Sequence, residues 1–345
     1  PTTATSYTTP ILSGGKLRGM SRPRVLSGIR PTGAGFHLGN YVGAVQHWVA
    51  MQDEYDCCYF IADLHALIEE TDPAQLRQRT RESAAELLAM GIDPQRSTLF
   101  VQSQVREHTE LGWILGCLTA FGEASRMTQF KDKGGGTVGL FTYPVLQAAD
   151  ILMYQADAVP IGEDQRQHLE ITRDLAQRFN RRYGETFTVP GQYIAKAGER
   201  IKDLQDPAKK MSKSLGGAGT LWVLDEPKVL TKKLKSAVTD TGREVAARAD
   251  KPGVTNLLTI LSAATGKAID ELEAAYVGKG YGDLKGGVAE AVVELFAPVR
   301  ERYAALIAAP DHLDEVLADG AARARAIAVA TMAGVRDRIG LLAPR

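Results

Sequence analysis

The chain has 345 residues, of which 44% are hydrophobic and 24% charged, and its formal net charge is zero. This is the composition of a soluble globular protein with one large domain or two smaller ones, and no apolar run reaches membrane-spanning length. Any nucleic-acid contact must come from a local patch, since net charge does not favour it. The three cysteines form no C-x-x-C pair, so neither disulfides nor a zinc site is predicted, which fits a reducing cytoplasm.

Residues 1–20 are rich in Thr, Ser and Gly and are expected to be a flexible extension. A strand is predicted at residues 25–29, and Pro31 ends it because proline lacks an N–H. Gly33 and Gly35 loosen the following loop, and apolar residues then recur at helical spacing from Tyr41. A strand, a glycine loop and a helix N-terminus form a natural phosphate site, where free N–H groups face the ligand. Taken alone, the stretch is more often an ordinary strand–helix turn than a phosphate site.

Further strands are predicted at residues 58–62 and 98–101, with a helix at 73–90 between them. This alternation predicts an α/β fold with a doubly wound parallel sheet. His65 follows the second strand at the edge where such sheets bind ligands. A purely structural histidine is an equal alternative.

The most informative predicted helix spans residues 143–154, after a helix at 107–121. It places Asp150 among apolar side chains, which is costly unless a group donates a hydrogen bond to the carboxylate. One interpretation is an aspartate paired with a neighbouring basic residue. The other is an acceptor for a ligand N–H in a pocket.

A fourth strand at 158–161 runs into the polar turn 162–168, which carries more polar residues than helix capping requires. Residues 210–214 read K-M-S-K-S, and two such lysines in a mobile loop can reach one polyphosphate, although this pattern is usually a solvated face. The rest is helical, with a basic stripe expected to be a solvated face at Lys228, Lys232 and Lys235. Helices are expected there at residues 255–264, 268–276, 288–307, 312–317 and 321–338.

The H-L-G-N turn at 37–40, followed far downstream by K-M-S-K-S, resembles the paired signatures of class I aminoacyl-tRNA synthetases. R-M-T-Q-F-K at 126–131, A-A-D-I-L-M-Y at 148–154 and G-E-D-Q-R-Q-H at 162–168 occur in the order seen in bacterial tryptophanyl-tRNA synthetases. The similarity covers nearly the whole chain.

The resemblance implies a tryptophan pocket in which Asp150 accepts the indole N–H and Tyr143 and Gln165 hold the α-amino group. If the buried acceptor is left unpaired without that N–H, phenylalanine is rejected. The implied tryptophan-binding residues are Ser27, Gly28, His65, Tyr143, Gln147, Asp150 and Gln165.

The resemblance also implies an ATP site with Mg²⁺ held through the phosphates and no metal site in the protein. The implied ATP-binding residues are Arg30, Thr32, Gly39, Asn40, Gly162, Asp164, Lys210, Met211, Ser212 and Lys213. The implied catalytic residues are His37, Asn40, Lys131, Lys210 and Lys213.

The implied architecture is a Rossmann-like catalytic domain at 21–217 and a helical domain at 218–345 that reads the anticodon of tRNA(Trp). A helical insertion at 104–143 is expected to form a homodimer, and residues 209–219 a mobile lysine loop. The implied activity is that of a cytoplasmic tryptophan–tRNA ligase with no membrane or DNA partner.

Three positions depart from the family pattern. His37 restores the general class I histidine where bacterial members more often have threonine, and Arg30 replaces a usual glutamine. Gln147 stands in place of a usual methionine, which predicts a more polar pocket that tolerates substituted indoles. The alternatives are a specialised second copy, a non-catalytic paralogue that binds tRNA or a protein, a tyrosine-specific enzyme, and another adenylyltransferase of the same superfamily. The phosphate lysines argue against a non-catalytic role.

Overall fold

The computed structural model describes residues 22–31, 33, 35–69, 72–127, 136–161, 165–193, 201–212 and 217–342. Its centre is one parallel sheet with strand order β3-β2-β1-β4-β5. The strands are β1 (Arg24–Ile29), β2 (Asp56–Ile61), β3 (Ser97–Val101), β4 (Ala158–Pro160) and β5 (Gly191–Tyr193). The predicted α/β fold is therefore confirmed. The short strand β5 was not predicted, because three half-buried residues give no clear alternation.

Helices cover both faces of the sheet because neighbouring strand residues point to opposite sides. Cys57 and Tyr59 of β2 pack in one apolar cluster with Trp48, whereas Cys58 and Phe60 pack in a second. The first cluster lies under α1 (Leu38–Asn40), the π-helix η1 (Tyr41–Val45), α2 (Gln46–Met51) and α4 (Pro73–Ala89). The second lies under α5 (Glu107–Gly116), α8 (Val138–Met153) and α9 (Arg166–Tyr183). Short helices are α3 (Asp63–Ala66), η2 (Gln102–Gln104), α6 (Phe121–Ala124) and η4 (Gly217–Gly219).

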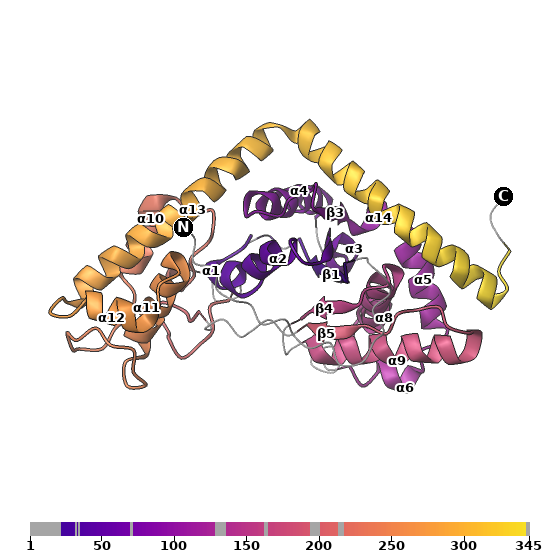
Figure 1. Cartoon of the computed structure of the whole chain (residues 1–345), viewed down its shortest axis with the longest axis horizontal. Coiled ribbons are helices and arrows are strands. Elements are labelled where there is room, and N and C mark those ends of the chain that lie inside the picture. Colours follow the sequence, from indigo (N-terminus) through magenta and orange to yellow (C-terminus); the bar gives the residue numbers. More distant parts are fainter. Residues whose placement is uncertain are drawn as a thin grey trace.

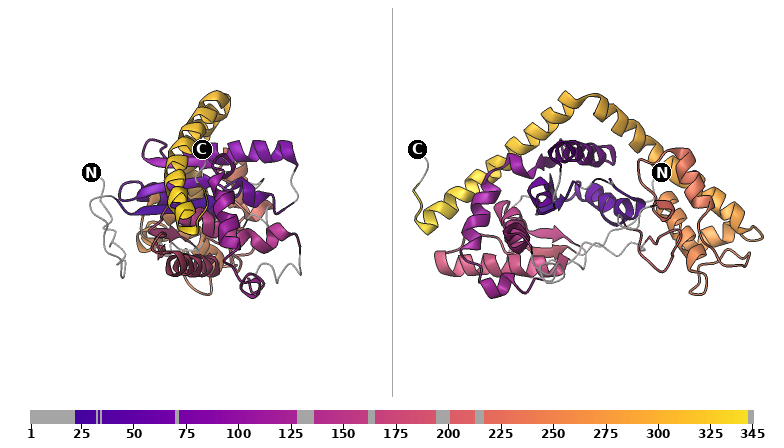
Figure 2. Two further views of the ribbon diagram at one scale, coloured as in Figure 1. Left: turned by 90° about the vertical axis from the view of Figure 1, so that its right-hand side faces the viewer. Right: turned by 180° about the vertical axis from the view of Figure 1, so that it is seen from behind.

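The two long C-terminal helices, α13 (Tyr281–Ala308) and α14 (Pro310–Ile339), form an arch over the sheet (Figures 1 and 2). The shorter helices α10 (Pro227–Lys235), α11 (Pro252–Thr265) and α12 (Ile269–Ala275) lie together at one end of this arch. The two helices predicted at 312–317 and 321–338 are the single helix α14, so that prediction was wrong. Its Gly320 packs on the backbone carbonyl of Leu99, where a Cβ would clash. The glycine marks a close backbone approach, not a helix end.

The second half of α14 lies against β3 and α5. Arg323 donates to the carbonyl of Pro94 at 2.6 Å, and Arg325 Nε lies 3.0 Å from Glu107 Oε1. Ala324 and Ala328 lie in the same apolar cluster as the strand residue Phe100. The last helix thus helps to cover the sheet, while the domain boundary at 217/218 stays a prediction.

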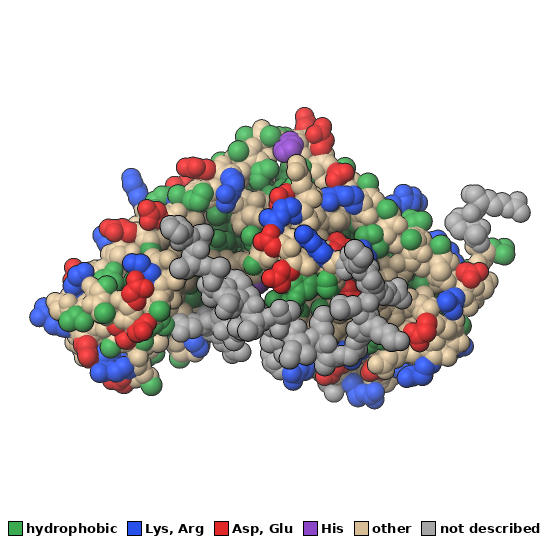
Figure 3. All heavy atoms as spheres, in the orientation of Figure 1, with side chains coloured by type: hydrophobic (Ala, Val, Ile, Leu, Met, Phe, Trp, Pro, Cys, Tyr) green, Lys and Arg blue, Asp and Glu red, His purple; other side chains and the backbone are tan. Residues whose placement is uncertain are grey.

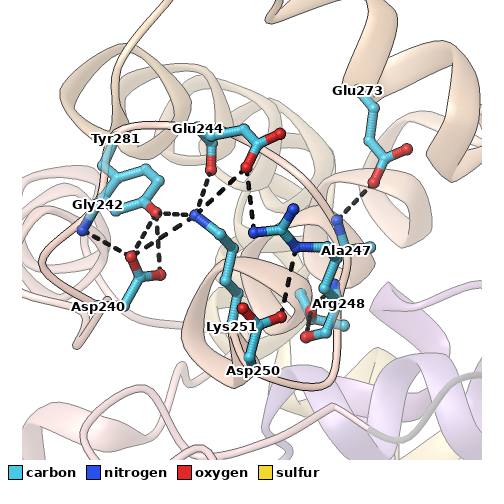
Figure 4. Close-up of polar contacts among 10 residues, drawn as sticks. Asp240, Gly242, Glu244, Ala247, Arg248, Asp250, Lys251, Glu273 and Tyr281 are labelled. Atoms are coloured by element: carbon cyan, nitrogen blue, oxygen red, sulfur yellow. Dashed lines mark hydrogen bonds and ion pairs between the residues drawn. The ribbon is translucent and has the colours of Figure 1, made fainter.

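A polar cluster fixes the connection between α10 and α11 against the start of α13 (Figure 4). The Lys251 ammonium lies 2.9 Å from the hydroxyl of Tyr281 and 3.1 Å from the carbonyl of Glu244. The Tyr281 hydroxyl donates in turn to Asp240 at 2.7 Å. Hydrogen bonds from Lys251, just before α11, and from Tyr281, at the start of α13, therefore fix the chain that leaves α10.

The surface carries mixed charge, as expected for a zero net charge. Figure 3 shows acidic and basic side chains interspersed over the face turned to the viewer. Within the described ranges, no helix has the length and apolar character needed to cross a membrane.

Candidate active site

The turn at residues 37–40 is rigid because it caps its own helix. His37 is the N-cap of α1, and its Nδ1 accepts the Asn40 N–H at 3.2 Å. The Asn40 side chain accepts the His37 N–H in return at 3.3 Å. The Leu38 N–H donates to the carbonyl of Leu221 at 2.8 Å. The N–H groups of Leu38 and Asn40 are thus used inside the protein, although free donors were expected here.

Glu86 holds the loop that enters this turn. Its carboxylate accepts the Phe36 N–H at 2.9 Å, and both residues are buried. Gly35 has a positive φ of 61°, which favours glycine, and a Cβ there would lie 2.9 Å from Glu86 Oε1. Glu86 was not predicted as a site residue, because a glutamate within a helix carries no signal in the sequence that its side chain points inward.

The downstream lysine motif lies beside this turn. Lys210 pairs with Lys202 in a short antiparallel bridge, and the Met211 N–H donates to Ile201 at 3.1 Å. The Met211 side chain is fully buried in the core, whereas Lys210 is exposed. The Ser212 carbonyl accepts a hydrogen bond from the Thr220 hydroxyl at 3.3 Å.

The chain after the lysine motif pairs directly with the first turn. His37 and Trp222 form an antiparallel bridge, and their ring centroids lie 5.9 Å apart in an edge-on contact. The Val223 N–H donates to the carbonyl of Phe36 at 2.9 Å. The structure thus brings together two motifs that lie far apart in the sequence.

Asp150 is the centre of a second polar group. It lies on α8, its side chain is 1% exposed, and three residues contact its carboxylate. His65 Nε2 lies 2.9 Å from Oδ2, and His108 Nδ1 lies 2.6 Å from Oδ1. Gln102 Nε2 donates to both oxygens at 2.8 and 2.9 Å. Burial alone raises the pKa of Asp150, but the hydrogen bonds from His108 and His65 outweigh it and hold the pKa well below its usual range.

His108 also contacts Tyr154, whose hydroxyl lies 2.7 Å from Nε2. A charged Asp150 only accepts hydrogen bonds, so His108 must present its Nδ1–H to it. Burial raises the pKa of Tyr154, so its hydroxyl stays protonated at neutral pH. The contact with Tyr154 on one ring nitrogen and with Asp150 on the other fixes the orientation of the His108 ring. Gln102 and His108 were not predicted as partners of Asp150, because they lie in the segment after β3, far from α8 in the sequence.

The pairing of Asp150 with basic neighbours, one of the two interpretations above, is what the structure shows. Both carboxylate oxygens already accept hydrogen bonds from the protein. The expectation that this carboxylate has no hydrogen-bond partner unless an indole N–H is present is therefore wrong. A ligand N–H at Asp150 must share an oxygen with a present donor, or replace one.

Tyr143 joins the Asp150 group to the first turns of α9. Its ring contacts His65 edge-on, with centroids 6.3 Å apart, and its hydroxyl lies 2.6 Å from His168 Nε2. Burial raises the pKa of Tyr143 to about 12, against the opposing charge of Arg30. The phenol is therefore protonated at neutral pH and can donate. His168, at the start of α9, was missed as a partner of Tyr143.

The remaining predicted site residues lie around these groups. Arg30 is exposed and pairs with Glu69 at 3.2 Å. Ser27 is buried in β1, and Gly28 lies so close to the ring of Phe60 that a Cβ would clash. Gly39 lies against the His37 ring, and a Cβ added to it would lie 3.1 Å from that ring.

Two predicted glutamines lie on the helices of the site. Gln147 is half-buried on α8 between Tyr143 and Asp150, and Gln165 is half-buried at the N-cap of α9. Thr32, Lys131, Gly162, Asp164 and Lys213 lie outside the described residues.

A sequence profile described as tRNA synthetases class I (W and Y) matches residues 20–297 of this chain. The chain belongs to this family. It is 58% identical over 329 residues to a tryptophan–tRNA ligase 2 of Streptomyces avermitilis, and the alignment covers 93% of this chain and 98% of that protein. It is 53% identical over 330 residues to a tryptophan–tRNA ligase of Leifsonia xyli, with 93% and 98% covered.

Solved structures of this family share the fold. The crystal structure of a tryptophanyl-tRNA synthetase of Mycoplasma pneumoniae matches with a TM-score of 0.82 and 37% identity, covering 93% of this chain and 98% of that one. A Campylobacter jejuni tryptophanyl-tRNA synthetase complexed with ADP and tryptophan matches with a TM-score of 0.82 and 38% identity, covering 92% and 100%.

Proposed function

We propose that the chain is a tryptophan–tRNA ligase. The observation that carries this is the 58% identity to a protein of that name over 93% of the chain. The contact between the 37–40 turn and the chain after the lysine motif supports it, because both motifs then face one ligand. The alternative of a specialised or non-catalytic paralogue is less well supported, since exposed Lys210 and the capped His37 turn are both in place.

The chemistry has two steps. The tryptophan carboxylate attacks the α-phosphate of ATP, and pyrophosphate leaves to give tryptophanyl-adenylate. The 2′-hydroxyl of the terminal tRNA adenosine then takes the acyl group and AMP leaves. No side chain becomes covalently bound, so the protein acts by positioning the reactants and by stabilising charge on the phosphates.

Each residue group has a place in this scheme. Tyr143 and Asp150 hold the tryptophan, while His37 and Lys210 face the phosphates of ATP. The Met211 side chain is buried in the core, so only its backbone can contact ATP. Mg²⁺ enters with the ATP phosphates, as is usual for nucleotide enzymes, and adds counter-charge there. We assign no protein ligand to it.

The test is amino-acid-dependent exchange between ATP and pyrophosphate with each of the twenty amino acids. We expect exchange with tryptophan alone, followed by charging of tRNA(Trp). Exchange with tyrosine would instead show that the chain is the tyrosine-specific enzyme. No exchange with any amino acid, from folded protein with Mg²⁺, would favour the non-catalytic paralogue.

We further propose that the protein is a cytoplasmic homodimer that binds tRNA(Trp) through its helical C-terminal region. Apolar side chains exposed in the 104–143 segment support the dimer. Trp113 of α5 is 76% exposed, Phe121 of α6 is 77% exposed, and Val138 of α8 is 78% exposed. Such residues are typical anchors of a protein interface.

Replacing either Trp113 or Phe121 alone by glutamate is expected to raise the dissociation constant of the dimer about 30-fold, since burying one aromatic anchor contributes about 2 kcal/mol. Sedimentation equilibrium measures it. Val277→Glu is the control, because Val277 is 81% exposed but lies after α12, outside the segment. Wild-type protein that sediments as a monomer, or an equal shift for the control, would contradict the proposed interface.

A further inference from the structure

Lys233 differs from the other lysines of α10. The helix carries an exposed basic stripe at Lys228, Lys232 and Lys235, as the sequence predicted. The Lys233 side chain is only 14% exposed and lies beside the buried residues Leu230 and Leu234. A lysine is seldom held this way unless its ammonium has partners.

The partners of Lys233 belong to the chain just after the lysine motif. Its Nζ donates to the Thr220 carbonyl at 2.8 Å and to Asp225 Oδ2 at 2.7 Å. Asp225 is 16% exposed, and the same oxygen accepts the Trp222 N–H at 3.1 Å. One ammonium and one carboxylate therefore fix the backbone of residues 220–225.

This backbone touches both halves of the site. Thr220 donates its hydroxyl to the Ser212 carbonyl at 3.3 Å, next to Met211 and Lys210. Trp222 lies edge-on against His37 and is bridged to it. Because α10 packs on α13, the pair anchors this segment to the helical arch.

We propose that Lys233 and Asp225 are positioning residues for the adenylate-forming step. They hold the segment 220–225, which aligns the lysine motif with the His37 turn, and they act on ATP rather than on tryptophan. This inference rests on the proposed function and deepens it. Neither residue faces the Asp150 group, which His65, Gln102 and His108 contact.

Lys233→Met is expected to lower kcat/KM for ATP in tryptophan-dependent exchange by about 10-fold, since small misplacements of positioning groups cost 10- to 100-fold. The KM for tryptophan should stay within about 2-fold of wild type. Rates are normalised to active sites titrated by the adenylate burst, so a loss of folded protein does not count. Lys232→Met is the matched control, because its side chain is exposed on the same helix, and it should behave as wild type.

Two further variants separate positioning from stability. Lys233→Arg keeps a charged donor for both acceptors and should restore most of the activity. Asp225→Asn with Lys233→Met should cost no more than the worse single change, because the two residues act as one unit. If Lys233→Met is not obtained folded, Asp225→Asn alone should show the same loss in kcat/KM for ATP.

The inference would be overturned if Lys233→Met changed kcat/KM for ATP and for tryptophan equally, or if its kcat/KM for ATP equalled that of Lys232→Met. It would also be overturned if the losses in kcat/KM for ATP were additive in the double variant. Wild-type protein without exchange would instead overturn the proposed function, so the two failures are distinguishable.

Discussion

Replacing Lys210 by alanine is expected to lower kcat of tryptophan-dependent ATP–pyrophosphate exchange by about 100- to 1,000-fold. This is the usual cost of removing one group that stabilises developing transition-state charge. Lys210 is exposed, and its backbone is fixed by the bridge to Lys202. Its ammonium is therefore available for a phosphate, and the bridge sets the position of its backbone. The effect should fall on kcat more than on the KM for tryptophan, because charge builds up on the phosphates during the reaction.

The neighbouring lysine provides the control. Lys209 is also exposed, but its ammonium pairs with Asp206 at 2.9 Å. Such a surface pair contributes little to stability, so Lys209→Ala should keep nearly full activity. If both variants lose the same activity, the loss reflects a general effect of charge. If Lys210→Ala keeps wild-type kcat, Lys210 does not act on the phosphates.

Replacing Asp150 by asparagine is expected to lower kcat/KM for tryptophan by about 150-fold. A hydrogen bond to a charged group contributes up to about 3 kcal/mol, which corresponds to this factor. The amide offers one acceptor where the carboxylate offers two, so one of the donors His65, Gln102 and His108 faces an N–H instead. ATP–pyrophosphate exchange at varied tryptophan measures the change. Asp157→Asn is the control, since that carboxylate accepts the backbone N–H of Arg24 in an exposed position.

The same carboxylate predicts a pH dependence of stability. Burial raises the pKa of the Asp150 carboxyl in the folded protein, but the hydrogen bonds from His108 and His65 outweigh burial and lower it. The stabilisation is therefore fully present above the ordinary aspartate pKa of about 3.9 and is lost as the pH falls below it. Denaturant unfolding should show wild type more stable than Asp150→Asn at pH 7, with a gap that narrows near pH 3. A gap that stays constant would show that Asp150 is not the charged partner of the two histidines.

The sequence by itself determined the elements that carry the site. Apolar runs separated by helical segments predicted the strands β1, β2 and β3 and that they run parallel, because these patterns depend on which residues are buried. It also placed Tyr143, Gln147 and Asp150 on one helix, since residues three and four apart share a helix face.

The partners of those residues were decided only by the tertiary structure. His108 reaches Asp150 because α5 packs on α8, and Gln102 reaches it from the short helix η2 that follows β3. Contacts of this kind join residues far apart in the chain, and the periodicity of one segment contains no information about the other. Gly320 shows the same limit, because the sequence indicates a helix break, while the packing of α14 on Leu99 shows why a glycine is needed inside the helix.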